Sequence, residues 1–138
     1  MTGEFTIAVH ALVFLKHKDA TVPSDEIAEN VCTNPARIRK VMASLKKAGL
    51  VETREGIKGG YHIGENASHI NLAQISDALG EESVKASWKS GNPEMTCLIA
   101  SGMAGIMDGI YSELNAVCRE KLESITLQSI ENQIFKNK

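Results

Sequence analysis

The stretch that decides the fold runs from Ser24 to Ile63 and reads "SDEIAENVCTNPARIRKVMASLKKAGLVETREGIKGGYHI". It begins as a short helix, because Ser24 can cap it and two acidic residues then stand where the helix dipole favours negative charge. The residues "CTN" break this helix. A second helix starts at Asn34–Pro35, since Asn34 can cap it and a proline loses no hydrogen bond in the first turn.

The second helix has one apolar face and one basic face, and Gly49 stands where a left-handed residue can end it. Its apolar residues recur at helical spacing; they are Ile38, Val41, Met42, Leu45 and Ala48. The opposite face carries Ala36, Arg37, Lys40, Ala43, Ser44 and Lys47. A short helix, a three-residue turn and a basic amphipathic helix form a helix-turn-helix, whose second helix enters the major groove of DNA.

Two short extended segments follow, "LVETRE" and "GYHI", with "GIKG" between them. Two strands joined by a glycine-containing turn predict a β-hairpin, and a hairpin directly after a recognition helix is a wing. The glycines at 56, 59 and 60 would shape its turn. A nucleotide-binding loop is the alternative, but it requires a helix after the loop and a Ser or Thr after the lysine, and both are missing here.

The flanking sequence predicts further helices. Residues 4–17 are apolar on most sides, which indicates a buried helix, and "INLAQISDALGE" predicts another. From about residue 100 to 124, apolar residues recur every three or four positions, as in a coiled coil, and Gly102, Gly105 and Gly109 share one face. A last apolar-patterned segment begins at Ile125. A long helix outside a small winged domain is most simply a dimerisation element.

The expected fold is therefore mainly α with a small β-hairpin wing. We expect a winged helix-turn-helix DNA-binding domain over residues 1–80, a linking loop over 81–99 and a helical dimerisation region over 100–138. The loop contains Trp88, which could anchor it to the body or to a second copy, or line a ligand pocket.

Charge is distributed unevenly along the 138 residues. The chain carries −2, but residues 34–63 contain seven basic and two acidic side chains, a local charge of +5, and the rest carries −7. Such a basic stripe is typical of a nucleic-acid-binding surface. There is no apolar run long enough to span a membrane and no secretory signal pattern. Three widely separated cysteines indicate a reducing cytoplasm.

Within this stripe, Arg37 and Lys40 are the candidates for base edges, because Arg and Lys match the acceptors of guanine. The side chains of Arg39, Lys46 and Lys47 suit phosphate contacts better. The full set of predicted DNA-contacting residues is Ser24, Asn34, Ala36, Arg37, Arg39, Lys40, Lys47, Arg54, Lys58, Gly59 and Gly60. The alternative is that the basic face is merely solvated, but the neighbouring turn and hairpin favour DNA.

No enzyme or metal site is expected. The four histidines are scattered, and no catalytic triad, metal triad or nucleotide motif is present. Cys97 is a possible thiol sensor, although its sequence neighbours supply no cation that would lower its pKa. A structural role as a small apolar side chain is the alternative for Cys97.

The sequence resembles the Rrf-type winged-helix regulators of bacteria, the group of IscR, NsrR and CymR. The resemblance rests on Ile27–Ala28, the L-x-x-x-G-L-V block from Leu45 to Val51, Gly59–Tyr61 and the I-x-L-x-x-I run from Ile70 to Ile75. It covers nearly the whole chain. It implies a homodimeric transcription regulator, usually a repressor, that binds a near-palindromic operator. A thiol-sensing or ligand-sensing regulator and a protein–protein adaptor are the alternatives.

Two departures from the family pattern matter. Iron–sulfur members carry three closely spaced cysteines in the loop before the long helix, where this chain has only Cys97. We therefore expect no cofactor, while a cluster shared with histidines and a partner chain stays open. The wing of many members reads Arg-Gly where this chain has Glu55-Gly56, so its basic residue is displaced to Arg54. The expected partners are double-stranded DNA, a second copy of the chain, and an unknown small ligand or protein co-regulator.

Overall fold

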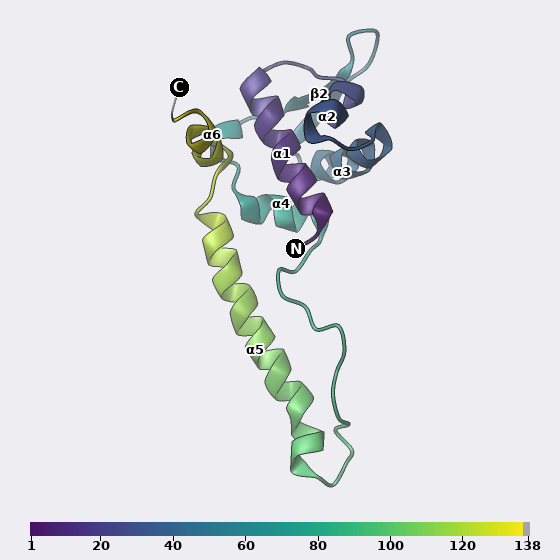
Figure 1. Ribbon diagram of the computed structural model, residues 1–138, viewed down its shortest axis with the longest axis vertical. Helices are drawn as coiled ribbons and strands as arrows, with labels where there is room; N and C mark the ends of the chain where they lie inside the picture. The colour runs from purple at the N-terminus through teal and green to yellow at the C-terminus, as the bar shows by residue number, and fades with distance from the viewer. Residues whose placement is uncertain (137–138) are drawn as a thin grey trace. The chain divides into compact units, whose positions relative to one another are not determined.

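The structure is a computed structural model that describes residues 1–136 (Figure 1). These residues form two compact units. One contains residues 2–81 together with 122–136, and the other contains Met1 and residues 82–121. The first is called the DNA-binding unit below and the second the long-helix unit.

The DNA-binding unit consists of six helical segments and one hairpin among the described residues. In chain order these are α1 (Gly3–Lys18), α2 (Ser24–Val31), α3 (Pro35–Lys47), β1 (Val51–Arg54), β2 (Gly60–Ile63), the 3-10 turn η1 (Ala67–His69), α4 (Leu72–Leu79) and α6 (Leu127–Phe135). The helix-turn-helix and the hairpin wing predicted from the sequence are confirmed. The fold is therefore a winged helix-turn-helix.

Helix α1 lies at the centre of the core of this unit. It packs against α2, α3, α4 and α6, which explains why it is apolar on most sides. Its fully buried side chains include Leu12 and Leu15, which join Ile27 of α2 and Ile38 of α3 in one apolar cluster. Burying each such side chain stabilises the fold by about 1.5–3 kcal/mol.

The turn between α2 and α3 is held by local hydrogen bonds. Asn34 caps α3, because its Oδ1 accepts a hydrogen bond of 2.8 Å from the backbone N–H of Arg37. Cys32 ends α2 in the left-handed conformation, with φ 66°. The predicted cap at Ser24 is wrong: Ser24 is already helical, and the residue before α2 is Pro23, which has no capping side chain.

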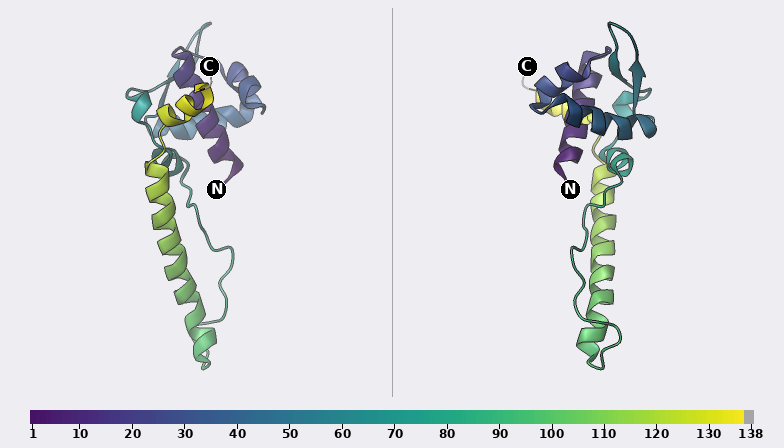
Figure 2. Two further views of the ribbon diagram at one scale, coloured as in Figure 1. Left: turned by 60° about the vertical axis from the view of Figure 1, so that its left-hand side comes forward. Right: turned by 90° about the vertical axis from the view of Figure 1, so that its right-hand side faces the viewer.

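The wing is an antiparallel pair in which Val51 lies opposite Ile63 and Arg54 lies opposite Gly60. Its tip projects away from the helices of its unit (Figure 2). The base of the wing is joined to the loop before α2, since Val22 and Tyr61 exchange two backbone hydrogen bonds of 2.8 Å. These bonds fix the wing beside α2 and α3.

Helix α6 packs against α1 of the DNA-binding unit. Leu127 is fully buried, and the Glu131 carboxylate binds Lys16 Nζ at 2.6 Å. A capping box at Thr126 starts α6 as a separate helix. The predicted region 100–138 therefore contains two helices that belong to different compact units. The apolar pattern indicated a new segment at Ile125, but it did not show that this segment belongs to the other compact unit.

The long-helix unit contains α5 (Leu98–Glu123), preceded by an extended segment over residues 82–97. The Asn115 side chain holds this segment, because it accepts from the N–H of Val84 and donates to its carbonyl, both at 2.7 Å. None of the described α5 residues is buried. A long helix usually gains most of its stability by burying an apolar face, but within the described residues the large apolar side chains along α5 from Leu98 to Val117 are exposed.

Candidate nucleic-acid interface

The outer face of α3 is exposed and basic. Its buried face consists of Ile38, Val41, Met42 and Leu45. At 100° per residue, the side directly opposite carries Ala36, Lys40, Ala43 and Lys47, all exposed. Two small side chains therefore alternate with two lysines along this side of the helix, a surface that lets a polyanion approach closely.

One edge of this face lies next to the first turn of α1. Lys40 Nζ is 3.3 Å from Glu4 Oε1, and a Cβ added to Gly3 would lie 3.0 Å from Arg37 Nη2. The two predicted base-reading residues are therefore close to the start of α1, and one of them has an acidic neighbour. Glu4 was not among the predicted site residues, because this contact joins positions that are distant in the chain.

The other edge lies next to α2 and the wing. Arg39 Nη1 donates to Ser24 Oγ at 3.4 Å, and Lys46 Nζ donates to Thr53 Oγ1 of β1 at 3.0 Å. These contacts bring the predicted phosphate-binding residues of α3 and Ser24 together on one surface. Thr53 is an addition to the predicted set. Thr53 lies in the predicted extended segment "LVETRE", and nothing in that pattern marked it as a contact of Lys46.

The start of α3 offers backbone N–H groups as well as side chains. The Asn34 side-chain oxygen is used by the cap, so the residue fixes the helix start. Helix N-termini bind phosphate through their free N–H groups and the positive end of the dipole. Asn34 is exposed beside Ala36, which agrees with the expected phosphate contact at this end of α3.

The wing turn carries two exposed basic side chains, Arg54 and Lys58, and between them a fully exposed Ile57. Glu55 is exposed in the same turn. The glycines of the turn have packing reasons that are independent of DNA. A Cβ at Gly60, where φ is +150°, would lie 2.3 Å from the Val22 carbonyl oxygen. A Cβ at Gly59 would lie 2.5 Å from the Arg54 carbonyl oxygen.

Cys97 is exposed immediately before α5. Hydrogen bonds from the backbone N–H groups of Ala100 and Ile99 lower the pKa of its thiol. No cationic side chain near Cys97 indicated this effect in the sequence, because backbone N–H groups at the start of a helix supply it. Trp88 is 78% exposed and lines a shallow hollow with Lys89, whose Nζ is 3.3 Å from Asp108 Oδ2.

The cysteines do not form a ligand set for iron within one chain. Cys32 lies in the helix-turn-helix, and 20 residues of helix (98–117), about 30 Å, separate Cys97 from Cys118. Across residues 1–136, no three His, Cys, Asp or Glu side chains come together as metal ligands would. The residues described here thus do not fit an iron site, and the expected lack of a cofactor stays a prediction. No helix in the same range could span a membrane.

A winged helix-turn-helix with an exposed basic recognition helix defines a class of DNA-binding protein. Residues 1–133 match the model of the Rrf2 family, which is described as iron-dependent transcriptional regulators. The chain belongs to the Rrf2 family. Its relatives are regulators rather than enzymes, so the expectation that it is not an enzyme is confirmed.

Curated relatives and solved structures agree with this membership. The chain is 24% identical over 136 residues to YwnA of Bacillus subtilis, an HTH-type transcriptional regulator by name, with 98% of this chain and 99% of YwnA covered. It is 27% identical over 125 residues to IscR of Photobacterium profundum, covering 91% of this chain and 70% of that protein.

Two of the solved structures with the same fold are T. potens IscR and CymR of B. subtilis. IscR has a TM-score of 0.74 and 21% identity, with 100% of this chain and 90% of that chain covered. CymR has a TM-score of 0.71 and 19% identity, with 96% of both chains covered.

Proposed function

We propose that this chain binds a near-palindromic operator as a homodimer in the cytoplasm and represses transcription from it. The observation that carries the proposal is the exposed outer face of α3, where Lys40 and Lys47 alternate with Ala36 and Ala43 on a winged helix-turn-helix. In this fold the second helix of the motif lies in the major groove.

The basic side chains on the two sides of α3 suit different contacts with DNA. Lys46 and Arg39 lie beside the wing and α2, where they suit the phosphates that flank the groove. Arg37 and Lys40 lie toward α1 and near the start of α3, where side chains of a recognition helix contact base edges. Lys58 and Arg54 extend the basic surface along the wing.

A homodimer is supported by the exposed apolar stripe of α5. The side chains of this stripe are between 41% and 86% exposed and are Leu98, Ile99, Met103, Ile106, Ile110, Leu114 and Val117. A contiguous apolar surface of this length marks an interaction site. A second copy offers the same stripe, and self-complementary contacts of this kind produce a two-fold dimer.

Three glycines in α5 fit close packing of a second helix. A Cβ at Gly102, Gly105 or Gly109 would meet no atom within 4 Å. Each glycine in a helix interior costs about 1 kcal/mol relative to alanine, and nothing within the described residues offsets this cost. A partner helix that approaches the glycine backbone would do so.

A two-fold dimer explains the proposed operator. Two symmetric α3 helices contact half-sites about 34 Å apart or multiples of that distance, so the operator repeats in inverted order. A dimer bound over a promoter excludes polymerase, which makes repression the simplest outcome.

The proposal is tested by titrating fluorescent DNA from upstream of the protein's own gene against unrelated DNA of equal length. Wild type should prefer the upstream DNA, and Arg37→Ala should lose about 1–3 kcal/mol of that preference. Lys85→Ala, which removes an exposed charge from the long-helix unit, is the matched control. Equal losses on both DNAs would contradict base reading by Arg37. The absence of salt-sensitive binding to either DNA would favour a protein–protein adaptor.

Thiol sensing by Cys97 is a second candidate function, favoured by its exposure and the lowered pKa of its thiol. Hydrogen peroxide would transfer one oxygen atom to the thiolate, giving a sulfenate and water. DNA affinity should then change after peroxide treatment in wild type but not in Cys97→Ser. An identical affinity in all four samples would contradict this function.

A further inference from the structure

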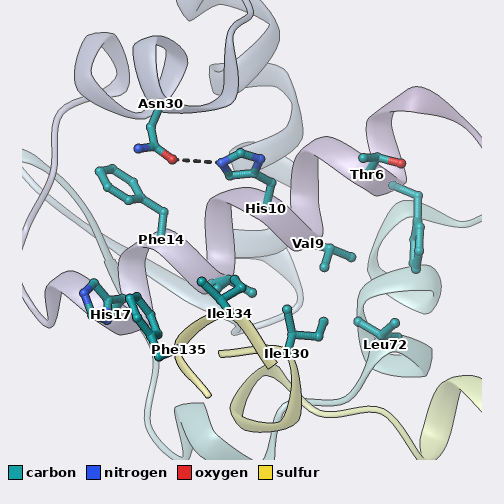
Figure 3. Close-up of a pocket in the computed structure, with 12 residues that line it drawn as sticks. Thr6, Val9, His10, Phe14, His17, Asn30, Leu72, Ile130, Ile134 and Phe135 are labelled. Atoms are coloured by element: carbon teal, nitrogen blue, oxygen red, sulfur yellow. Dashed lines mark hydrogen bonds between the residues drawn. The ribbon is translucent and has the colours of Figure 1, made fainter. Parts of the chain in front are cut away.

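A pocket of about 610 Å³ lies between α1, the end of α2 and α6, entirely within the DNA-binding unit (Figure 3). Pockets for small organic ligands have volumes of about 300–1,000 Å³. Most of its wall is apolar, with Val9 and Val13 from α1 and Ile130 and Ile134 from α6. Its volume and lining therefore match a small-molecule site rather than a packing defect.

The aromatic residues of the chain are concentrated in this pocket. The protein has three phenylalanines, and all of them line it: Phe5, Phe14 and Phe135. Phe135 also stacks on His17, with ring centroids 4.5 Å apart and planes inclined by 18°. Aromatic rings prefer offset stacking or edge-to-face contact with other rings. This lining favours a flat aromatic ligand.

A polar pair stands on the wall formed by α1 and α2. His10 Nε2 and Asn30 Oδ1 are 2.8 Å apart, and Figure 3 shows the two side chains pointing toward each other. The imidazole and the amide together present both donor and acceptor atoms to a ligand. Apolar walls with a few polar groups are the usual composition of a specific ligand site.

The α6 wall is fixed to α1 by contacts between protein side chains. Glu131 Oε2 binds Lys16 Nζ at 2.6 Å, and Glu131 Oε1 lies 3.0 Å from His17 Nδ1. Leu127 of the same helix is fully buried in the core. The pocket is therefore preformed, which lowers the entropic cost of binding.

We propose that this pocket binds a flat aromatic small molecule with one hydrogen-bonding group, and that its occupancy changes DNA affinity. The ring would lie among the phenylalanines and its polar group at His10 and Asn30. The claim that occupancy changes DNA affinity rests on the proposed DNA-binding function.

The pocket is connected to the recognition helix α3 through two of its lining elements, α2 and α1. Asn30 stands in the last turn of α2, two residues before Cys32 opens the turn to α3. Helix α1, which supplies most of the pocket wall, also packs directly against α3. A ligand that shifts α1 or α2 therefore acts on the position of α3, and only a ligand with different affinities for the two arrangements alters DNA binding.

A second copy of the chain could instead place a side chain in the pocket. We favour the small molecule because the α5 stripe already supplies an extended apolar surface for a second copy, while the pocket is concave and combines rings with a polar pair. The two occupants are distinguished by the experiment.

The experiment titrates the full chain with 1-anilinonaphthalene-8-sulfonate, a fluorescent aromatic probe. Wild type should bind one probe per chain at the pocket. Val9→Trp, which fills it, should weaken this binding at least tenfold, and His10→Ala, a milder change, at least threefold. Val117→Glu on the α5 stripe should leave it unchanged. Circular dichroism checks that each variant is folded.

Equal affinity of wild type, Val9→Trp and His10→Ala would overturn the site, as would loss of binding only in Val117→Glu. A change of oligomeric state in Val9→Trp, measured by analytical ultracentrifugation, would assign the pocket to a second copy of the chain.

The claim that pocket occupancy changes DNA affinity has its own test. Saturating wild type with probe should change its DNA affinity at least threefold, and the same treatment should not change the DNA affinity of Val9→Trp. An unchanged DNA affinity of wild type would overturn the regulatory claim but not the binding site. If wild type binds no DNA, the proposed function fails while the fluorescence result still decides the site.

Discussion

Lys40 Nζ lies 3.3 Å from Glu4 Oε1, so an acidic side chain of α1 partly neutralises a lysine of the recognition face. The lysine is largely exposed, with 72% of its side chain accessible, against 33% for the glutamate. Water screens such a pair, so DNA competes readily for Lys40. We therefore expect Glu4 to lower the DNA affinity of the proposed interface without preventing binding.

Glu4→Gln should raise affinity for DNA about two- to fivefold, because it removes a negative charge close to the phosphates and releases Lys40. Fluorescence anisotropy with operator DNA at low salt measures the change. Glu113→Gln makes the same change of net charge on exposed α5 and is the control. A matching gain in the control would show that only net charge matters.

Gly60→Ala should destabilise the fold by about 2–4 kcal/mol, since the added methyl group meets the Val22 carbonyl and alanine disfavours a φ of +150°. Urea denaturation measures this loss. Gly56→Ala is the control, because its φ is +103° but open space surrounds the added Cβ. Its cost should be about 1 kcal/mol, from backbone strain alone. Equal costs for the two variants would refute the close contact with Val22.

Glu131→Gln should lower the free energy of unfolding by about 1–2 kcal/mol at neutral pH, because it removes a carboxylate hydrogen-bonded to Lys16 and His17. Those hydrogen bonds lower the pKa of Glu131 below its ordinary value of 4.5. A lowered carboxyl pKa stabilises the fold above the unfolded-state pKa, and the effect is lost as pH falls through the folded-state value.

The difference in stability between wild type and Glu131→Gln should therefore shrink as the pH falls below 4.5, the ordinary pKa of the carboxyl group, and through the lowered pKa of the folded state. Urea titrations at several pH values measure it. A difference that grows with acidification would mean that the carboxylate is not the stabilising form.

Ile110→Glu should convert a dimer into a monomer, because it places a charge in the middle of the exposed apolar stripe of α5. The monomer should then bind operator DNA at least tenfold more weakly, since one half-site is lost. Analytical ultracentrifugation measures the mass, and Ser112→Glu, on an exposed position of the same helix outside the stripe, is the control. A monomeric wild type would contradict the homodimer.

Features that depend on neighbouring residues in the chain could be predicted from the sequence. The Asn34–Pro35 start of α3, the apolar periodicity of that helix and the glycine-containing turn after it depend on neighbours in the chain, and the structure has all three. The role of Gly60 could be predicted only in part. The sequence indicated a turn, but its close approach to Val22 depends on how the wing packs against the loop before α2.

Contacts between distant segments could not be predicted. The pairing of Glu4 with Lys40 and of Glu131 with Lys16 depends on the packing of α1 against α3 and α6. The pocket among the three phenylalanines has the same origin, because residues from both ends of the chain form it. The sequence directed attention to Trp88 instead. In the structure that side chain is mostly exposed.

The claim that α3 and the wing bind DNA is tested most directly by the salt dependence of binding to the DNA upstream of the protein's own gene. The logarithm of the association constant should fall linearly with the logarithm of salt concentration, and Lys47→Ala should reduce the slope by about one per chain. Lys85→Ala should leave it unchanged. A binding constant that is independent of salt, or equal slopes for wild type and Lys47→Ala, would contradict the account.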